Sequence, residues 1–387
     1  MGMRVRKWLV LGVACFLIFL ADYMQFQLSS YAYLIIPELG LNASQFSSLL
    51  MAPMLTAVFT SVPLGSLADR YGSKRVILAA GMLAIAGAGM RIGATDFATY
   101  FAAMVLLGFS PASLNANLIK IFGFWFDDRI NIAMGAFYAS ASCGIVAALL
   151  TSHLFSSVTA AYSVTATALV VGMVLWAVLA RSEAPKSARA SLSTVRYMAV
   201  AARNRSVWIV AVVLGLGLAS TTALSGFFPQ FLEFDWGIGA DRAGFITAQF
   251  TLGSIVGSLV GPAICYQIGH YKPLLLPVGF IGGALMTSVG TLPVMGLGAS
   301  MLLMGIFTSA AGPVLEALPY SFSSIGEKYA GSAGGIIGMV SMGMAFVVPT
   351  AISAICPDSY PVMFELMGLA FIASTVCLFR LPDIGEA

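Results

Sequence analysis

The chain has 387 residues, of which 59% are hydrophobic and 9% are charged, and its formal net charge is +3. A mean hydropathy of +0.94 excludes a soluble globular protein, because no water-soluble domain could bury so much apolar surface. A membrane β-barrel needs alternating apolar and polar positions, and the long apolar runs lack that alternation. The composition therefore predicts an all-α polytopic membrane protein whose main partner is the lipid bilayer, and we expect no nucleic-acid partner.

A helix needs about 20 apolar residues to cross a bilayer. The sequence contains twelve stretches of that kind, at residues 8–34, 45–67, 75–94, 98–125, 131–153, 159–181, 206–231, 242–268, 272–292, 294–318, 329–353 and 360–380. The first stretch is too long for a cleaved signal peptide, so we interpret it as the first transmembrane helix.

The charges between these stretches favour one orientation. With a cytoplasmic N-terminus, the outer loops contain a single basic residue, Arg242, beside acids that include Glu38, Asp96, Glu233 and Asp358. All other loop lysines and arginines then lie inside, as the positive-inside rule requires. We therefore expect a multi-pass protein of the inner (plasma) membrane with both termini in the cytoplasm.

The longest polar stretch divides the chain into two halves. The sequence predicts a six-helix bundle at residues 1–181, a cytoplasmic linker at 182–205 and a second six-helix bundle at 206–387. Glycines of the two halves match at nearly constant offsets, 197 residues for Gly72 with Gly269 and Gly108 with Gly305, and 199 residues for Gly135 with Gly334 and Gly144 with Gly343. These matches predict two pseudo-symmetric bundles.

One short loop concentrates charge between two apolar stretches. Residues 65–75 read Gly-Ser-Leu-Ala-Asp-Arg-Tyr-Gly-Ser-Lys-Arg, with glycines that permit a sharp turn. This segment resembles the loop between helices 2 and 3 of the major facilitator superfamily of secondary transporters. The resemblance implies twelve helices in two halves, a substrate site at the midplane between them, and a cytoplasmic gate formed by Asp69, Arg70, Lys74, Arg75, Gly65 and Gly72. The alternative is that the loop only enforces topology by its positive charge.

We interpret four ionisable residues as membrane-embedded: Asp22, Arg91, Lys120 and Glu316. A charge at that depth costs at least about 2.5–3.5 kcal/mol on insertion scales, so each needs a partner, water or a function. Asp22 and Glu316 are candidates for proton coupling, although Asp22 could instead be neutralised by a neighbour such as Arg91. Arg91 is expected to extend to the membrane interface from a peripheral helix.

Polar residues on the predicted fourth helix form a candidate substrate site. Asn117 and Lys120 share a helix face, Ser113 lies one turn before Asn117, and Asn115 lies between. With Gln27 and Tyr31 of the first helix, this stripe suits a carboxylate or another small anion. The resemblance places helices 4 and 10 face to face, so Lys120 and Glu316 are expected to pair at an inner gate, unless each pairs within its own half.

These patterns predict a secondary active transporter that moves a small solute, most readily a small anion, by alternating access and with a proton as coupling ion, as symport or antiport. The chain has no nucleotide-binding loop and no catalytic cluster, so we expect no enzyme activity, no cofactor and no metal. The alternative is a proton-driven exporter of hydrophobic compounds; a membrane-embedded sensor or enzyme is a remote one. We expect a monomer.

Overall fold

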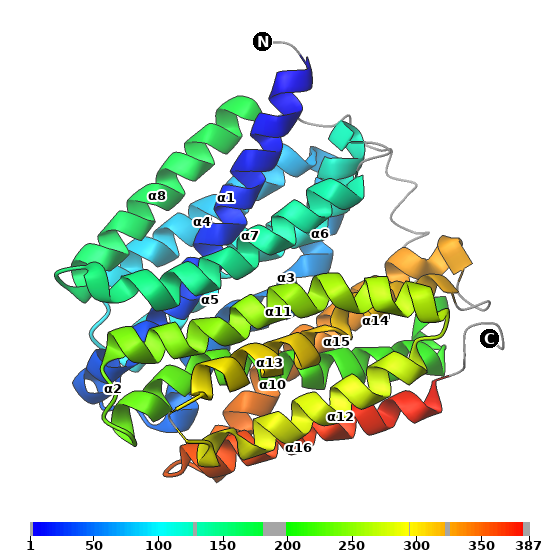
Figure 1. The fold of residues 1–387 in the computed structure, drawn as a ribbon. Coiled ribbons are helices and arrows are strands. Elements are labelled where there is room, and N and C mark those ends of the chain that lie inside the picture. The colour runs from blue at the N-terminus through cyan, green and yellow to red at the C-terminus, as the bar shows by residue number, and fades with distance from the viewer. Residues whose placement is uncertain (1–2, 127–129, 181–198, 294, 322–325, 382–387) are drawn as a thin grey trace. The chain divides into compact units, whose positions relative to one another are not determined.

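The computed structural model describes residues 3–126, 130–180, 199–293, 295–321 and 326–381 (Figure 1). All regular structure in these ranges is helical, and twelve helical segments are long and apolar enough to cross a membrane. The predicted all-α class and the count of twelve spans are confirmed. Residues 182–198 of the expected linker lie outside the described residues, and residues 199–202 are helical.

Unit 1 is a compact group formed by residues 1–41 and 48–190. Its helices are α1 (Met3–Ser30), α2 (Ala32–Leu39), α3 (Ala43–Tyr71, whose first residues group with unit 2), α4 (Ser73–Ile92), α5 (Phe97–Leu107), α6 (Phe109–Phe126), α7 (Ile130–Thr151), the 3-10 turn η2 (Ser152–Leu154) and α8 (Val158–Leu179). Within it, α1 packs against α7 and α8, and α4 packs against α5 and α8.

Unit 2 is formed by residues 42–47 and 191–387. Its helices are α10 (Arg205–Phe234), α11 (Ala240–Ile268), α12 (Lys272–Ser288) with the 3-10 turn η3 (Val289–Thr291), α13 (Leu297–Ser309), α14 (Gly312–Ser321), α15 (Gly326–Ile355) and α16 (Tyr360–Cys377) with η4 (Leu378–Arg380). Within it, α10 packs against α15 and α16, and α12 against α16. In the repeat, α12 and α16 of unit 2 correspond to α4 and α8 of unit 1. The contact between α4 and α8 therefore recurs in unit 2 as the contact between α12 and α16.

Side-chain caps define several helix starts. Asp96, Ser157, Asn204 and Ser359 precede α5, α8, α10 and α16 and accept hydrogen bonds from backbone N–H groups of the first turn. The hydroxyl and the backbone N–H of Thr99 both donate to Asp96, which lowers the pKa of this carboxyl below its ordinary value.

Three predicted spans are interrupted. The helix of the first span begins at Met3 and ends at Ser30, and a short helix follows Tyr31, so the single predicted stretch at 8–34 is divided in two near its end. The fourth breaks at Gly108, between α5 and α6, and the tenth breaks just before the Gly312–Pro313 pair, between α13 and α14. Breaks in the fourth and tenth helices agree with the glycines and prolines found there in the sequence.

Two of the matched glycine pairs occupy equivalent places. Gly72 ends the turn into α4 with φ +87°, and Gly269 ends α11 with φ +77°, a conformation that favours glycine. A Cβ at Gly108 would lie 2.7 Å from the Cα of Pro53, and a Cβ at Gly305 would clash with the carbonyl of Phe250, which follows Pro53 by the same 197 residues. The two halves thus repeat their close helix contacts.

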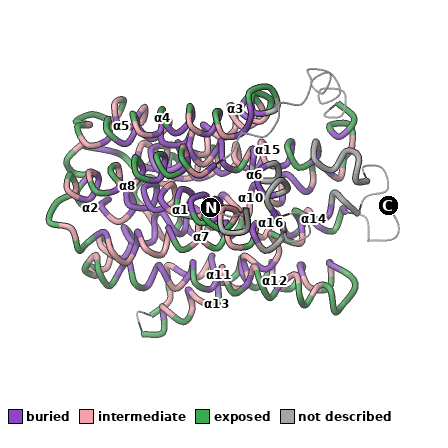
Figure 2. Tube along the Cα trace, turned by 90° about the horizontal axis from the view of Figure 1, so that it is seen from above, coloured by how far each residue is buried: buried purple, intermediate pink, exposed green. Residues whose placement is uncertain are grey.

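Most spans carry buried residues along one side and exposed residues along another (Figure 2). Their polar groups are few, and their backbone hydrogen bonds are made within each helix, as lipid requires. The interior of each unit is therefore where the ionisable and amide side chains are informative.

Candidate functional site

The charged loop at 65–75 forms the tight turn that its sequence predicts. Helix α3 ends at Tyr71, Gly72 takes the positive φ, and α4 begins at Ser73. Arg70 is exposed with its guanidinium carbon 5.2 Å from the centre of the Tyr71 ring, Lys74 is half-buried and Arg75 is exposed. The side chain of Asp69 lies outside the described residues, so the gate role of this loop stays a prediction.

The predicted polar stripe of the fourth helix divides between two faces of α6. Ser113 and Asn117 are fully buried, and their side chains donate to the carbonyls of Ser110 and Ser113 within the helix. The amide oxygen of Asn117 is buried without a hydrogen-bond partner. Asn115 is exposed and donates to the Pro111 carbonyl. Lys120 belongs to α6, but its side chain is outside the described part of the structure.

Arg91 is the strongest departure from expectation. Its side chain is 2% exposed, so the prediction that it extends to the membrane interface is wrong. Nη1 donates to the Met24 carbonyl of α1 at 2.5 Å, and Nη2 donates to Oε1 of Gln27 at 3.0 Å. The ring of Tyr162 on α8 lies 3.8 Å from the guanidinium carbon. Backbone, amide and aromatic groups therefore hold the cation inside unit 1.

We call Arg91, Met24, Gln27, Tyr162 and Thr165 the Arg91 centre. The Thr165 hydroxyl lies 3.5 Å from Oε1 of Gln27, and the hydroxyls of Tyr162 and Tyr100 are hydrogen-bonded to each other. Two donors in this centre, Nε of Arg91 and Nε2 of Gln27, are buried without an acceptor. Within the described residues no carboxylate bonds to Arg91, so the charge of the guanidinium is not neutralised there.

Gln27 and Tyr31 are therefore not on an exposed surface of unit 1. Gln27 is 0% exposed in the Arg91 centre, and Tyr31 is 3% exposed with its hydroxyl donating to the Ser152 carbonyl. The role of both side chains in a substrate path stays a prediction. Their contacts hold α1 against α4, η2 and α8, because tertiary packing rather than position along the helix decides which side of α1 faces the core.

The two candidate proton carriers lie in less enclosed places. Asp22 is half-buried on α1, and Glu316 is exposed on α14. Asp22 forms no ion pair with Arg91, which contradicts the alternative that Arg91 neutralises it. The expected pair of Lys120 and Glu316 stays a prediction, because the Lys120 side chain is not described.

Unit 2 contains a related centre in which no cation is among the described partners of the glutamine. Gln230 of α10 is fully buried, accepts from the Tyr360 hydroxyl at 3.5 Å and donates to the Gly226 carbonyl. Tyr360 follows Tyr162 by 198 residues, and Ser288 follows Arg91 by 197. The repeat thus preserves the tyrosine and a nearby glutamine, but it places a serine where unit 1 has the arginine.

Two ionisable residues were missed as membrane-embedded groups. Glu233, expected in an outer loop, lies within α10, and both of its carboxylate oxygens are buried without a hydrogen-bond partner. Glu365 lies within the span of α16. Each could have been found from its place near the end of an apolar run. Among the described residues, no group of three His, Cys, Asp or Glu side chains could hold a metal ion.

Comparisons with known proteins agree with this architecture. The family model of the Major Facilitator Superfamily matches residues 11–349. A crystal structure of a mutant nucleoside transporter NupG has a TM-score of 0.78 and 15% identity, covering 96% of this chain and 98% of that one. A mutant peptide transporter POT in complex with sulfate has a TM-score of 0.75 and 15% identity, covering 95% and 93%.

A curated relative is an uncharacterized protein of Archaeoglobus fulgidus, 33% identical over 132 residues. The match takes in 34% of this chain and 59% of that protein's length. The twelve candidate spans define a multi-pass membrane protein. The extent of the family match shows that the chain belongs to the Major Facilitator Superfamily.

Proposed function

We propose that the protein carries a small organic or inorganic anion by alternating access, coupled to protons. The observation that supports an anion most directly is the Arg91 centre, where a buried guanidinium has no carboxylate among its described partners. In a low-dielectric interior, such a charge creates a positive potential that extends over several ångströms. An anion near unit 1 is favoured by this field without touching Arg91.

The binding group itself is proposed to be Lys120 of α6. The exposed Asn115 lies on the same helix and can contribute a hydrogen-bonding amide. Ser113 and Asn117 are buried on the other face of α6 and support the helix from inside unit 1. Gln27 and Tyr31 act as positioning residues, since both are committed to contacts inside unit 1.

Proton coupling is proposed to use Asp22 in unit 1 and Glu316 in unit 2. Asp22 is the acid on α1, five residues before Gln27, and it is not paired with Arg91. Protonation of Asp22 would remove one negative charge from α1 and leave the positive charges of unit 1 in excess. Entry of a proton would therefore favour entry of an anion, which is the logic of symport.

Substitution of Lys120 in proteoliposomes tests the binding role. We expect Lys120→Met to raise the KM for the transported anion about tenfold or more, because a charged hydrogen bond contributes about 1.5–3 kcal/mol. Lys120→Arg should retain most uptake because it keeps the charge. Lys272→Met, at the first residue of α12, is the matched control and should leave uptake unchanged. Equal uptake by Lys120→Met and the wild type would contradict the proposal, as would transport restricted to lipophilic cations.

A further inference from the structure

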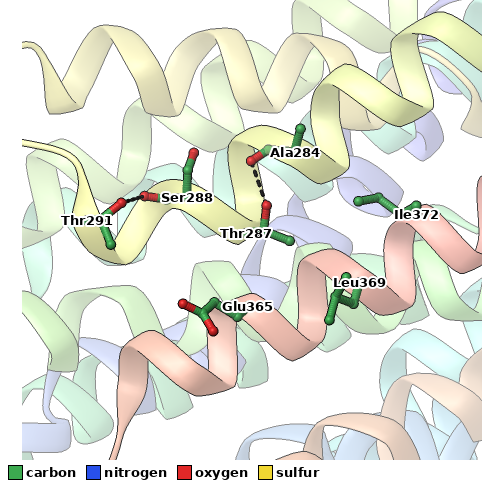
Figure 3. Close-up of a pocket in the computed structure, with 7 residues that line it drawn as sticks. All are labelled: Ala284, Thr287, Ser288, Thr291, Glu365, Leu369 and Ile372. Carbon is green, nitrogen blue, oxygen red and sulfur yellow. Dashed lines mark hydrogen bonds between the residues drawn. The ribbon is translucent and has the colours of Figure 1, made fainter.

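A groove on unit 2 lies outside the proposed substrate site and contains a carboxylate at membrane depth. It has a volume of about 430 Å³ and is lined by Ala284, Thr287 and Ser288 of α12, Thr291 of η3, and Glu365, Leu369 and Ile372 of α16 (Figure 3). This volume is within the range of small-molecule sites. Glu365 extends from α16 toward the hydroxyl-bearing turns of α12 (Figure 3).

The face that carries the groove is apolar and exposed. On α16, Val362, Leu369 and Val376 are exposed at seven-residue intervals, and Leu369 is 54% exposed. On α12, Phe280 and Ile281 are exposed as well. Val362, Leu369 and Val376 form an apolar stripe along α16. Glu365 lies on the same side of the helix and is the charged residue among these four positions. An exposed apolar face within a membrane span contacts lipid, so the groove opens to the bilayer.

The polar groups in the groove are hydrogen-bond acceptors. The Thr287 hydroxyl donates to the Ala284 carbonyl at 2.8 Å, Ser288 donates to Leu285 at 3.1 Å, and Thr291 donates to Ser288 at 2.8 Å (Figure 3 shows the first and third). A hydroxyl has one proton, so each of these oxygens presents only lone pairs to the groove. The Glu365 carboxylate also only accepts, and within the described residues it has no hydrogen-bond or ion-pair partner.

The packing beneath the groove keeps these acceptors in place. A Cβ at Gly368 would lie 2.5 Å from Cγ2 of Thr287, and one at Gly290 would lie 2.9 Å from Cβ of Pro361. Helices α12 and α16 therefore touch through glycines, and the Thr287 methyl is packed against α16. This contact orients the Thr287 hydroxyl toward its own helix.

Glu365 lies near the N-terminal end of its membrane span. It lies five residues after the start of α16, about 7.5 Å along the helix axis. Helical side chains tilt toward the N-terminus, which for α16 is the membrane surface, so the carboxylate is brought closer to the headgroups. A group that enters the groove from that layer needs positive charge and several N–H donors.

We infer that the groove binds the headgroup of a phospholipid with a primary ammonium, of the phosphatidylethanolamine class. The ammonium donates three hydrogen bonds, one or more to Glu365 and the others to hydroxyl oxygens of α12 and η3, while the acyl chains follow the apolar stripe of α16. A quaternary choline group has the same charge but no N–H donor and is a poorer fit.

Native mass spectrometry of the full-length protein tests this site. The protein is titrated with phosphatidylethanolamine, its N-methyl and N,N-dimethyl forms, phosphatidylcholine and phosphatidylglycerol with identical acyl chains. We expect retention to fall stepwise as N–H groups are replaced, with about tenfold separation between the first lipid and phosphatidylcholine. Equal retention of these two lipids by the wild type would overturn the inference without any variant.

Three variants localise the effect. Glu365→Gln should abolish the preference for the primary ammonium, and Thr291→Val should reduce it. Asp358→Asn, an exposed acid two residues before α16, is the matched control and should retain it. A preference that survives Glu365→Gln would assign the lipid to another site. A dimer that Glu365→Gln dissociates would instead show that a second copy of the chain covers the groove.

Discussion

At the scale of single residues, Arg91 shows how tertiary contacts change the meaning of a charge. Its position near the end of an apolar stretch is typical of a side chain that reaches the interface. The structure instead surrounds it with a carbonyl, an amide oxygen and an aromatic ring. These partners come from α1 and α8, far from Arg91 in the sequence, so no local pattern indicates them.

The unneutralised charge of Arg91 predicts an unusual stabilising substitution. Gln27→Glu keeps the size of the side chain and removes the buried Nε2 donor, which has no acceptor. It also places a carboxylate oxygen where Oε1 of Gln27 now lies, 3.0 Å from Nη2 of Arg91. We expect the free energy of unfolding to rise by about 1–3 kcal/mol. The melting temperature of the purified protein in detergent measures this change.

The matched control is Gln230→Glu in unit 2. Gln230 is equally buried, but the groups that bond to it are the Tyr360 hydroxyl and the Gly226 carbonyl rather than a cation. A carboxylate there is buried without compensation, so this variant should melt lower than the wild type. If Gln27→Glu also melts lower, Arg91 is neutralised by a group that these contacts do not include.

At the scale of helices, glycines set the separation of α11 and α13. Gly253, Gly257 and Gly261 lie four residues apart on α11, and a Cβ at each would clash with the carbonyl of Leu302, Ile306 or Ala310 of unit 2. This spacing places the three glycines on one helix face, as in other close contacts between membrane helices. The packing is too tight for any side chain.

We expect Gly257→Ala to lower stability by about 1–3 kcal/mol, because its Cβ would lie 2.9 Å from backbone carbons of Ile306 and could not be accommodated by a rotamer change. Gly89→Ala is the matched control, since no atom lies within 4 Å of its Cβ position in α4. Melting temperatures of the two variants should therefore separate clearly. Equal melting temperatures would show that α11 and α13 can move apart without cost.

The sequence predicts helices better than helix interruptions. Hydrophobic length alone locates all twelve spans, and Gly-Pro indicates the break before α14. The break at Tyr31 has no glycine or proline at that position. Tyr31 is fixed by the bond of its hydroxyl to Ser152 of η2, a contact between distant segments, so local propensity could not reveal it.

At the scale of the whole molecule, the internal repeat was the most reliable signal. Gly108 with Pro53 and Gly305 with Phe250 show that both halves use the same close contacts, separated by 197 residues. Arg91 of unit 1 and Ser288 of unit 2 occupy equivalent positions, 197 residues apart. At this position, unit 1 therefore has a buried positive charge and unit 2 does not.

The candidate site was less predictable than the fold. Residue type and position along the spans identify Asp22, Arg91, Lys120 and Glu316 as ionisable groups that need a partner or a function inside the membrane. They do not indicate which of these side chains is buried in the protein. Gln27 and Tyr31 were assigned to a substrate path by position along α1, and packing places both inside unit 1. Burial is a property of the assembled helices, and a single sequence does not contain the helix rotations that determine it.

Reconstitution into proteoliposomes tests proton-coupled transport of a small anion most directly. Proteoliposomes containing the wild-type protein are given a pH gradient, and uptake of small monocarboxylates, inorganic anions and lipophilic cations is compared with and without a protonophore. We expect saturable anion uptake that an acidic exterior drives and the protonophore abolishes. Uptake confined to lipophilic cations, or anion uptake that is indifferent to the gradient, would contradict the account.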